Sequence, residues 1–289
     1  MELNGAPASP EQMRVLALTN YGHFTSMLVQ DFAVRGLPLH LERLTRDCRQ
    51  LFDTDLDTNA VRHQVRHALA GNPGPVMVRV TVYDPALDLG TIGSDAEPSV
   101  LVTTRPAGHG ALAPLRLQAA RYQRETPTVK HVSLFGALTH RRRAQRAGFD
   151  DVLFISDDGM ISEASTSNIG FVRQGRVLWP RAAWLPGVTM ALIDQRLDQP
   201  ATTEPVNLSD LQDLEAAFVT SSGTGVRAVL SVDRTEWCTD HEVLDKVREL
   251  YAETPLRAAV TAHRWNSFIR SARSTSDSPG SRITSMIFS

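Results

Sequence analysis

Only two of the 30 lysine and arginine residues in this 289-residue chain are lysines, Lys130 and Lys246. Arginine stays protonated at any ordinary pH, whereas a lysine amine can lose its proton and act as a nucleophile or base. A lysine kept in a chain that otherwise uses arginine is therefore a candidate for amine chemistry. Lys246 follows Glu242 by four residues on a predicted helix, where an ion pair accounts for it. Lys130, in "TPTVKHVSLFG", is the candidate that remains, and the alternative is a surface lysine retained by chance.

Three further stretches carry groups that complement a lysine amine. Glu163 lies among small and apolar residues of a predicted strand, where a carboxylate needs a cationic partner. "LPGVT", residues 185–189, and "TSSGTG", residues 220–225, both offer backbone N–H groups and hydroxyls to a phosphate, the first at the start of a predicted helix. Arg43, in "HLERL", can supply a bidentate cation.

Together these groups meet the requirements of pyridoxal 5'-phosphate. A lysine forms a Schiff base with the cofactor. A carboxylate keeps the pyridine nitrogen protonated, so that the ring can withdraw electrons. The N–H groups, hydroxyls and arginine hold the phosphate. The sequence therefore predicts a pyridoxal phosphate enzyme.

Other chemistries lack their motifs. His63 and His67 have helical spacing typical of a metal pair but no third ligand, so a solvated helix face explains them and no metal site is predicted. "HRRRAQR", residues 140–146, is also typical of a solvated helix face. The chain has no GxSxG elbow, no Walker GxxxxGK[ST] and no strand followed by GxGxxG. Hydrolase, nucleotide-phosphate and zinc chemistries are thus unsupported.

The composition favours a globular protein without a nucleic-acid or membrane partner. Hydrophobic residues make up 42% of the chain, and its net charge of −2 gives no reason to expect nucleic acid or an anionic membrane. No stretch approaches the ~18 apolar residues that a membrane span needs. The first residues lack the apolar core of a secretory signal, and Cys48 and Cys238 show no metal spacing. We therefore expect a cytoplasmic protein.

The first part of the chain mixes strands and helices. Its predicted elements are extended segments within 14–30, helices over 37–52 and 59–71, and strands over 75–85 and 99–106. A stretch rich in Gly, Pro and Ala, residues 106–118, is the predicted boundary between two domains.

The second part is richer in strands. Between residues 150 and 180, apolar runs alternate with Asp-Asp-Gly and Arg-Gln-Gly turns, which predicts a series of antiparallel hairpins. The other predicted elements are a strand over 115–123, helices over 134–148, 188–197 and 240–253, and two strands within 216–233. The Ser-, Arg- and Gly-rich end of the chain has little to bury and is expected to be disordered.

The order of Lys130, "AGFDDVLFISDDGMISEASTSNIGFV" and "LPGVT" resembles the class IV aminotransferase family, the fold-type IV pyridoxal phosphate enzymes. That family includes branched-chain aminotransferases, D-amino acid aminotransferases and aminodeoxychorismate lyase. The resemblance covers roughly residues 2–255 and is most specific over 127–190. It implies a two-domain α/β (α+β) fold, with a small N-terminal α/β domain and a larger C-terminal domain with a barrel-like sheet. It also implies a homodimer with the cofactor at the domain interface.

On this basis we expect three parts of the chain. Residues 1–112 form the small domain, residues 113–260 form the pyridoxal-phosphate-binding domain, and residues 261–289 form a disordered tail.

The resemblance assigns a role to each matching residue. Lys130 resembles the lysine that forms the Schiff base and shuttles protons, and Glu163 resembles the partner of the pyridine nitrogen. Asn168 matches a family asparagine to which we assign a structural role. The phosphate ligands that the resemblance implies are Arg43, Val188, Thr189, Ser222 and Gly223.

The segments that build the substrate pocket depart from the family. Ser133 and Phe135 stand where relatives carry an asparagine and a tyrosine or another polar group near the phenolic oxygen of the cofactor. Phenylalanine cannot donate a hydrogen bond to that oxygen. Leu28 stands where many relatives carry arginine.

Four residues remain as candidates for substrate contact. Arg79 and Arg105 could bind a substrate carboxylate, although arginines on the exposed edge of a strand would look the same. Tyr21 and His23 could line the pocket. Because the pocket departs from the family, the amino donor and its D or L configuration do not follow from the resemblance.

Three functions fit the resemblance. The leading hypothesis is an aminotransferase that acts on an amino acid and 2-keto acid pair. The alternative is a lyase of the aminodeoxychorismate type, which releases 4-aminobenzoate and pyruvate. The third is a catalytically idle dimer that binds pyridoxal phosphate, and the intact pair of Lys130 and Glu163 argues against it.

Overall fold

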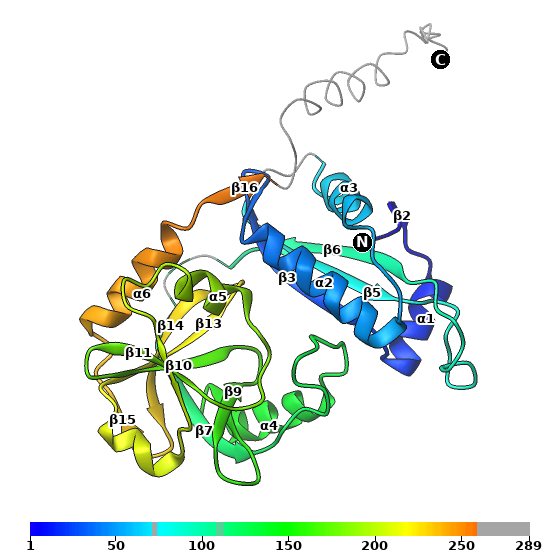
Figure 1. Ribbon diagram of the computed structural model, residues 1–289. Helices are drawn as coiled ribbons and strands as arrows, with labels where there is room; N and C mark the ends of the chain where they lie inside the picture. The colour runs from blue at the N-terminus through cyan, green and yellow to red at the C-terminus, as the bar shows by residue number, and fades with distance from the viewer. Residues whose placement is uncertain (71–73, 109, 111, 259–289) are drawn as a thin grey trace, which may run out of the picture.

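The computed structural model describes residues 1–70, 74–108, 110 and 112–258, and its strands form two separate sheets (Figure 1). The first sheet has the strand order β16-β4-β3-β5-β6-β1-β2, and all of its pairings are antiparallel. Its strands are β1 (Glu2–Leu3), β2 (Ala6–Pro7), β3 (His23–Gln30), β4 (Ala33–Arg35), β5 (Val76–Tyr83), β6 (Ser99–Pro106) and β16 (Leu256–Ala258).

Two helices, α2 (Leu37–Phe52) and α3 (Thr58–Ala68), cover one face of the first sheet (Figure 1). Their apolar stripes share one core with alternate residues of β3 and β5, such as Met27 and Val80. Successive residues of a strand point to opposite faces, so Phe24 of β3 lies on the other face. That second face borders Lys130, whereas Arg43, a further expected site residue, lies on α2 at the first face.

The helix α1 (Pro10–Thr19) replaces part of the extended segment that the sequence predicted. The side chain of Ser9 accepts a hydrogen bond from the N–H of Gln12 at 3.2 Å, and Gln12 Oε1 accepts one from the N–H of Ser9 at 2.9 Å. Pro10 follows at the first helical position, where a missing N–H is tolerated. The prediction of extended chain over 14–19 was wrong because this capping box, and not the weak apolar pattern, decides the local structure.

The second sheet closes into a barrel. Its strand order is β12-β11-β10-β13-β14-β7-β8-β9, and a further pairing of Glu163 with Asn168 joins β9 to β10. The ring β10-β13-β14-β7-β8-β9 is therefore closed on itself. Its strands and their neighbours are β7 (Leu115–Arg121), β8 (Asp151–Ile155), β9 (Ile161–Ala164), β10 (Asn168–Arg173), β11 (Arg176–Pro180), β12 (Thr202–Glu204), β13 (Ala216–Ser221), β14 (Gly225–Val232) and β15 (Thr235–Glu236).

Apolar side chains from every strand of this ring form one buried cluster. It includes Leu117, Leu153, Ile161, Ile169, Val219 and Val229. Outside the ring, α5 (Val188–Asp194) and α6 (Glu242–Ala252) share a second cluster with Trp179 and Phe218. The helix α4 (Phe135–Arg146) packs on β7 and β8, and a short 3-10 helix, η1 (Leu208–Asp213), precedes β13.

The segment that carries Lys130 connects the two sheets. His131 forms an antiparallel bridge with His23 at the start of β3. The N–H of Phe24 donates a hydrogen bond to the carbonyl oxygen of Lys130 at 2.9 Å. The main chain around the candidate lysine is therefore fixed against the first sheet.

Most predicted elements are present. The helices expected over 37–52, 134–148, 188–197 and 240–253 are confirmed, as is the described part of the helix expected over 59–71. The strands expected over 75–85, 99–106, 115–123 and 216–233 and the hairpins of 150–180 are also confirmed. The expected helix end at Gly71 and the expected disordered tail over 261–289 lie outside the described residues. No helix in the described part of the chain is both long and apolar enough to cross a membrane.

Two features after α5 differ from the expectations. Lys246 Nζ lies 3.5 Å from Asp198 Oδ2, so its ion-pair partner is not Glu242. After α6 the chain returns to the first sheet, where β16 pairs with β4. The domain boundaries after 112 and 260 stay predictions.

Candidate active site

Lys130 lies where the two sheets meet, with its Nζ 5.0 Å from the centre of the Phe24 ring. Burial, together with neighbouring cations, lowers the pKa of the Lys130 amine to about 7. The side chains whose charges act on this amine are Arg43, Arg124, Glu163 and Arg79. An amine with this pKa is partly unprotonated at neutral pH, so it can attack a carbonyl carbon or accept a proton.

Glu163, on β9, has a buried cationic partner. Arg124 Nε lies 2.9 Å from Glu163 Oε1, and the two side chains are only 8% and 10% exposed. The N–H of Leu185 donates to the other carboxylate oxygen at 3.3 Å. The ion pair compensates the charge of a carboxylate that would otherwise be costly to bury.

Arg124 also binds the segment that leads to Lys130. Its Nη1 donates to the carbonyl oxygen of Val129 at 3.0 Å, and its Nη2 donates to that of Pro127 at 2.5 Å. One guanidinium therefore connects Glu163 to the main chain beside the lysine. The sequence interpretation did not include Arg124, although the need of Glu163 for a cation and the position of Arg124 six residues before Lys130 were a usable signal.

Arg43 is buried on the face of α2 that packs on β3. The residue is 5% exposed, and its Nη2 donates to Thr25 Oγ1, which also bonds to His40 Nδ1 at 2.7 Å. Burial lowers the pKa of Arg43 to about 10, so the guanidinium is still charged at neutral pH. Its Nε makes no hydrogen bond within the described residues.

The start of α5 lies against the start of α2. Val188 and Thr189 are the first residues of α5, and both are buried. A Cβ added to Gly36, the residue before α2, would lie 2.9 Å from Val188 Cγ1. The two helices that carry Arg43 and Thr189 are therefore in contact at their N-terminal ends.

Ser222 and Gly223 form the turn between β13 and β14, and this turn approaches the first sheet. A Cβ added to Gly223 would lie 3.3 Å from Met77 Cε on β5. Just before the turn, Thr220 is 2% exposed, and its hydroxyl has no hydrogen-bond partner within the described residues. Thr220 is the first residue of the stretch 220–225 that the sequence offers to a phosphate, although the resemblance names only Ser222 and Gly223 there.

The arrangement suits a phosphorylated ring with a basic nitrogen. The Nε of Arg43 and the hydroxyl of Thr220 are buried polar atoms without a protein partner in the described part of the chain, and a bound phosphate would provide acceptors for them. Lys130 offers an amine with a lowered pKa, and Glu163 offers a carboxylate held by Arg124. The residues present therefore fit pyridoxal phosphate.

Asn168 connects the strand beside Glu163 to the loop before α5. Its Nδ2 donates to the carbonyl oxygen of Leu185 at 2.8 Å. Because Leu185 also donates its N–H to Glu163, this loop is bound at two points. The contacts agree with the structural role expected for Asn168.

Arg79 lies on the face of the first sheet that borders Lys130. Its guanidinium carbon is 3.6 Å from the centre of the Phe24 ring, and its Nε donates to Thr81 Oγ1 at 3.2 Å. Burial lowers the pKa of Arg79. Within the described residues, no carboxylate lies at ion-pair distance from it. Arg105 is exposed on β6 and pairs with Met77, so it lies on the same face as Arg79.

Tyr21 and His23 lie against the end of α2, on the other side of the first sheet. The Tyr21 hydroxyl donates to the carbonyl oxygen of Leu51 at 2.9 Å, and its ring is 5.5 Å from that of Phe52. His23 is fully buried, with its ring 6.1 Å from Phe52. Burial lowers the pKa of His23 to about 3, so its ring is neutral. The structure thus brings Arg79, and not these two residues, beside Phe24 and Lys130.

Ser133 and Phe135 take no part in the group around Lys130. Ser133 Oγ donates to the carbonyl oxygen of Asn20 at 2.6 Å. Phe135 begins α4 and is 84% exposed. The side chain that stands where some relatives carry a tyrosine or another polar group therefore points to solvent and not to the other site residues.

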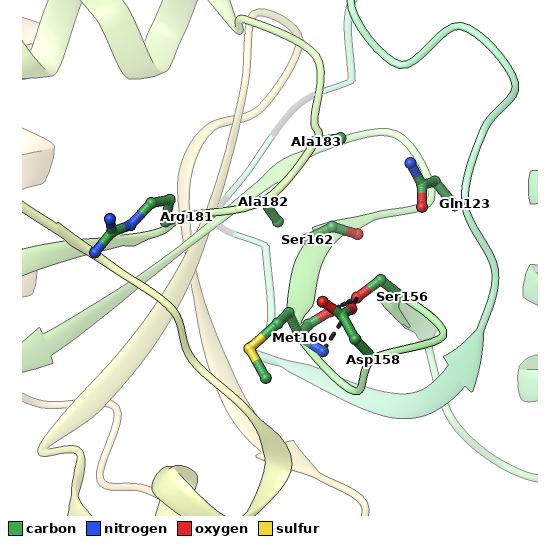
Figure 2. A pocket seen from close by; sticks show the side chains of 8 residues that line it. All are labelled: Gln123, Ser156, Asp158, Met160, Ser162, Arg181, Ala182 and Ala183. Atoms are coloured by element: carbon green, nitrogen blue, oxygen red, sulfur yellow. Dashed lines mark hydrogen bonds between the residues drawn. The ribbon is translucent and has the colours of Figure 1, made fainter.

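A separate small cavity lies at the other face of β9. Its volume is about 170 Å³, and Figure 2 shows its lining, Gln123, Ser156, Asp158, Met160, Ser162, Arg181, Ala182 and Ala183. Ser162 precedes Glu163 on the strand, and consecutive strand residues point to opposite faces. None of the expected site residues lines this cavity.

Comparisons with known proteins place the chain among enzymes. A family model described as amino-transferase class IV matches residues 22–232. The probable branched-chain-amino-acid aminotransferase of Rickettsia bellii is 24% identical over 273 residues, which cover 87% of this chain and 94% of that relative.

Two solved structures share the fold of this chain. The putative 4-amino-4-deoxychorismate lyase of Legionella pneumophila has a TM-score of 0.73 at 22% identity, with 81% of this chain and 91% of that chain covered. The PLP-bound form of a hypothetical aminotransferase from Mycobacterium tuberculosis has a TM-score of 0.73 at 19% identity, with 86% and 94% covered.

Proposed function

Because this chain belongs to the class IV aminotransferase family, we propose that it is a pyridoxal-phosphate-dependent aminotransferase that acts on an amino acid and 2-keto acid pair. The fold-type IV architecture expected from the sequence is confirmed by the shared fold. The observation that carries the proposal is the position of Lys130 where the two sheets meet, near the buried Arg124–Glu163 pair, with the pKa of its amine lowered to about 7 by burial and by the charges of Arg43, Arg124 and Arg79.

Different residues are proposed to bind the cofactor and to transfer the proton. When bound, pyridoxal phosphate withdraws electrons from the carbon that carries the substrate amine. Lys130 would hold the cofactor through its amine, and the same amine, when free, would accept the proton from the substrate Cα. Glu163, which Arg124 holds in place, would keep a proton at the ring nitrogen. The residues proposed to hold the phosphate are Arg43, Val188, Thr189, Ser222 and Gly223.

Arg79 is proposed to bind a carboxylate of the substrate. It is a partly buried cation near Lys130 that lacks an acidic partner in the described part of the chain, so an anionic ligand would compensate its charge. Arg105, on the same face, is a candidate for a second contact. Tyr21 and His23 would act only through the packing around α2. A homodimer, as the resemblance implies, and a cytoplasmic location, as the composition favours, are part of the proposal.

The first experiment asks which lysine attaches the cofactor. The full chain is incubated with pyridoxal phosphate, reduced with borohydride and examined by mass spectrometry. We expect the cofactor mass on Lys130, and its loss in Lys130→Ala and in Lys130→Arg, which keeps a positive charge but no usable nucleophile. Lys246→Ala is the matched control, because it removes the only other lysine, and it should keep full attachment. Attachment that persists in Lys130→Ala would refute the proposal.

The second experiment identifies the amino donor. The visible absorption of the loaded protein is recorded with single L- and D-amino acids in the absence of a keto acid. An aminotransferase must convert its cofactor to the pyridoxamine form with at least one donor, and that donor gives the substrate class and configuration. If the protein attaches the cofactor but none of these amino acids converts it to the pyridoxamine form, the protein does not transaminate any of the donors tested.

The alternative function is a lyase that releases pyruvate and 4-aminobenzoate from aminodeoxychorismate. Its support is the shared fold of the Legionella pneumophila protein, whose name is that of a putative lyase. The two functions separate cleanly, because a lyase forms pyruvate from aminodeoxychorismate without any keto acid, whereas an aminotransferase needs an acceptor for each turnover. The third possibility, an idle cofactor-binding dimer, requires that neither reaction occurs.

A further inference from the structure

Asp47 is a fully buried acid that none of the proposed roles uses. It lies on α2, one helical turn after Arg43, and is 0% exposed. Its Oδ2 accepts a hydrogen bond from the backbone N–H of Lys130 at 2.9 Å. A helix that carries a proposed phosphate ligand therefore also holds the main chain of the proposed nucleophile.

Arg46 compensates the charge of Asp47 and adds a second connection. Its Nε and Nη2 donate to Asp47 Oδ1 at 2.9 and 2.6 Å. Its Nη2 also donates to the carbonyl oxygen of Thr128 at 2.8 Å. The pair thus binds the lysine segment at two backbone groups, one N–H and one carbonyl.

The other contacts of this segment come from different elements. The N–H of Phe24 in β3 donates to the Lys130 carbonyl oxygen, and Arg124 donates to the Val129 carbonyl oxygen. Among the hydrogen bonds between described residues, only those of Asp47 and Arg46 connect the segment to α2. Removal of Asp47 should therefore loosen Lys130 relative to Arg43 and leave its attachment to β3 in place.

We propose that Asp47 is a positioning residue, which fixes the main chain of Lys130 to the helix that carries Arg43. A charge-assisted bond from a buried carboxylate restricts the Lys130 backbone, so the amine and the phosphate-binding guanidinium keep a constant separation. Such restriction matters because a small misplacement of a reacting group lowers the rate strongly. The inference rests on the proposed function for its catalytic consequence but not for the contact itself.

The contact is tested by hydrogen–deuterium exchange of the full chain without added cofactor. In Asp47→Ala the amide of Lys130 loses its acceptor, and we expect its exchange to accelerate about 10- to 100-fold. Asp84→Ala is the matched control: Asp84 is 5% exposed and accepts hydrogen bonds from the N–H groups of Ala86 and Glu97, both at 2.7 Å. The control should leave the Lys130 amide unchanged.

The catalytic consequence is tested on the loaded enzyme. We expect kcat to fall about 10-fold or more in Asp47→Ala with little change in KM for the amino donor, and the visible circular dichroism of the bound cofactor to weaken. If Asp47→Ala does not fold, Asp47→Asn replaces it. Its neutral oxygen makes a weaker bond, so exchange at Lys130 should accelerate about threefold or more.

The outcomes separate the two proposals. The positioning role would be overturned if Asp47→Ala had the same exchange rate at the Lys130 amide and the same kcat as Asp84→Ala. It would also be overturned if the Lys130 amide of Asp47→Asn exchanged at the wild-type rate. If the wild-type chain attaches no cofactor at Lys130, the proposed function fails, and the exchange comparison still decides whether Asp47 anchors the segment.

Discussion

Arg124 and Arg79 both lie near Lys130, but their surroundings differ. Arg124 forms a buried ion pair with Glu163 at 2.9 Å and donates two further hydrogen bonds to the main chain. Arg79 lies over the ring of Phe24 at 3.6 Å and has no carboxylate at ion-pair distance among the described residues. The charge of Arg124 is compensated by a carboxylate of the protein, whereas the charge of Arg79 has no such partner among the described residues.

The difference indicates two functions for buried positive charge at one site. A cation that is fully paired belongs to the scaffold, because removing it leaves its partner charge buried and uncompensated. A cation that is buried without a partner costs stability in the free protein, and an anionic ligand can recover that cost. On the barrel side the buried cation is thus already paired, and on the side of the first sheet we expect the proposed substrate carboxylate to supply the missing partner of Arg79.

The largest expected effect is on stability. Arg124→Met should lower the free energy of unfolding by about 3–5 kcal/mol, because Glu163 stays buried without its cation. Urea unfolding of the cofactor-free protein measures this change. Adding Glu163→Gln to Arg124→Met should restore part of the loss, since the uncompensated charge is removed. A double variant that is less stable than Arg124→Met alone would contradict the pairing as the source of the effect.

A smaller effect is expected in binding. Arg79→Met should change the free energy of unfolding by no more than about 1 kcal/mol, because it removes a stacked cation but no ion pair. It should raise KM for a carboxylate-bearing donor about 10- to 100-fold, the loss expected for a charged hydrogen bond. Steady-state kinetics with the donor found for the wild-type chain provide the measurement.

The control for Arg79→Met is a substrate without the carboxylate. An amine that lacks this group should react slowly with the wild-type chain and at the same rate with the variant. Equal losses for both substrates would show that Arg79 supports the site in general and does not recognise the carboxylate. A stability loss as large as that of Arg124→Met would remove the distinction between the two arginines.

Lys130 and Glu163, which the structure brings into one region, could be singled out from the sequence because they are chemically unusual. Lys130 is one of two lysines, and Glu163 is a carboxylate inside an apolar strand. The hairpins beside Glu163 were predictable from their turns, where Gly159 and Gly175 adopt positive φ angles of 84° and 66°. Rare residues and turn chemistry are local signals, so sequence alone can find them.

The supporting residues could not be found in the same way. Arg124 is one of many arginines, and Asp47 differs from other helix acids only in the face on which it lies. Which face is buried depends on the packing of α2 against β3. The same holds for Phe24 and His23, which are neighbours on one strand: the alternation of β3 aims the first at Lys130 and the second at Phe52.

The short pairing of β16 with β4 could not be predicted from the sequence either. It joins residues Leu256–Ala258 to Ala33–Arg35, and neither segment has a strong strand pattern of its own. Pairing of such short segments is decided by the position that α6 gives to the end of the described chain. A contact between distant segments of this kind needs the fold before it can be predicted.

The smallest expected effect is a shift in the pH dependence of cofactor attachment at Lys130, an amine on which the charges of both arginines act. The pKa of Lys130 is lowered to about 7, first by burial and then by cations that include Arg43, Arg124 and Arg79. The rate at which the cofactor-free chain attaches pyridoxal phosphate should therefore rise with pH through about 7 and level off above it, because only the neutral amine reacts. An ordinary lysine would give a rate that still rises near pH ~10.

Removing Arg79 should move this midpoint to higher pH, since one of the cations that disfavour the ammonium form is lost. Arg79→Met leaves the Arg124–Glu163 pair intact, so the shift reports Arg79 alone. Rapid-mixing absorption measurements across about pH 6–10 give the midpoint, with Arg105→Met as a control because that exposed arginine is not among the charges that act on Lys130. A midpoint that stays fixed or falls in Arg79→Met would mean that the Arg79 charge does not reach the amine, and the carboxylate it is proposed to bind would then have to lie away from the reacting carbon.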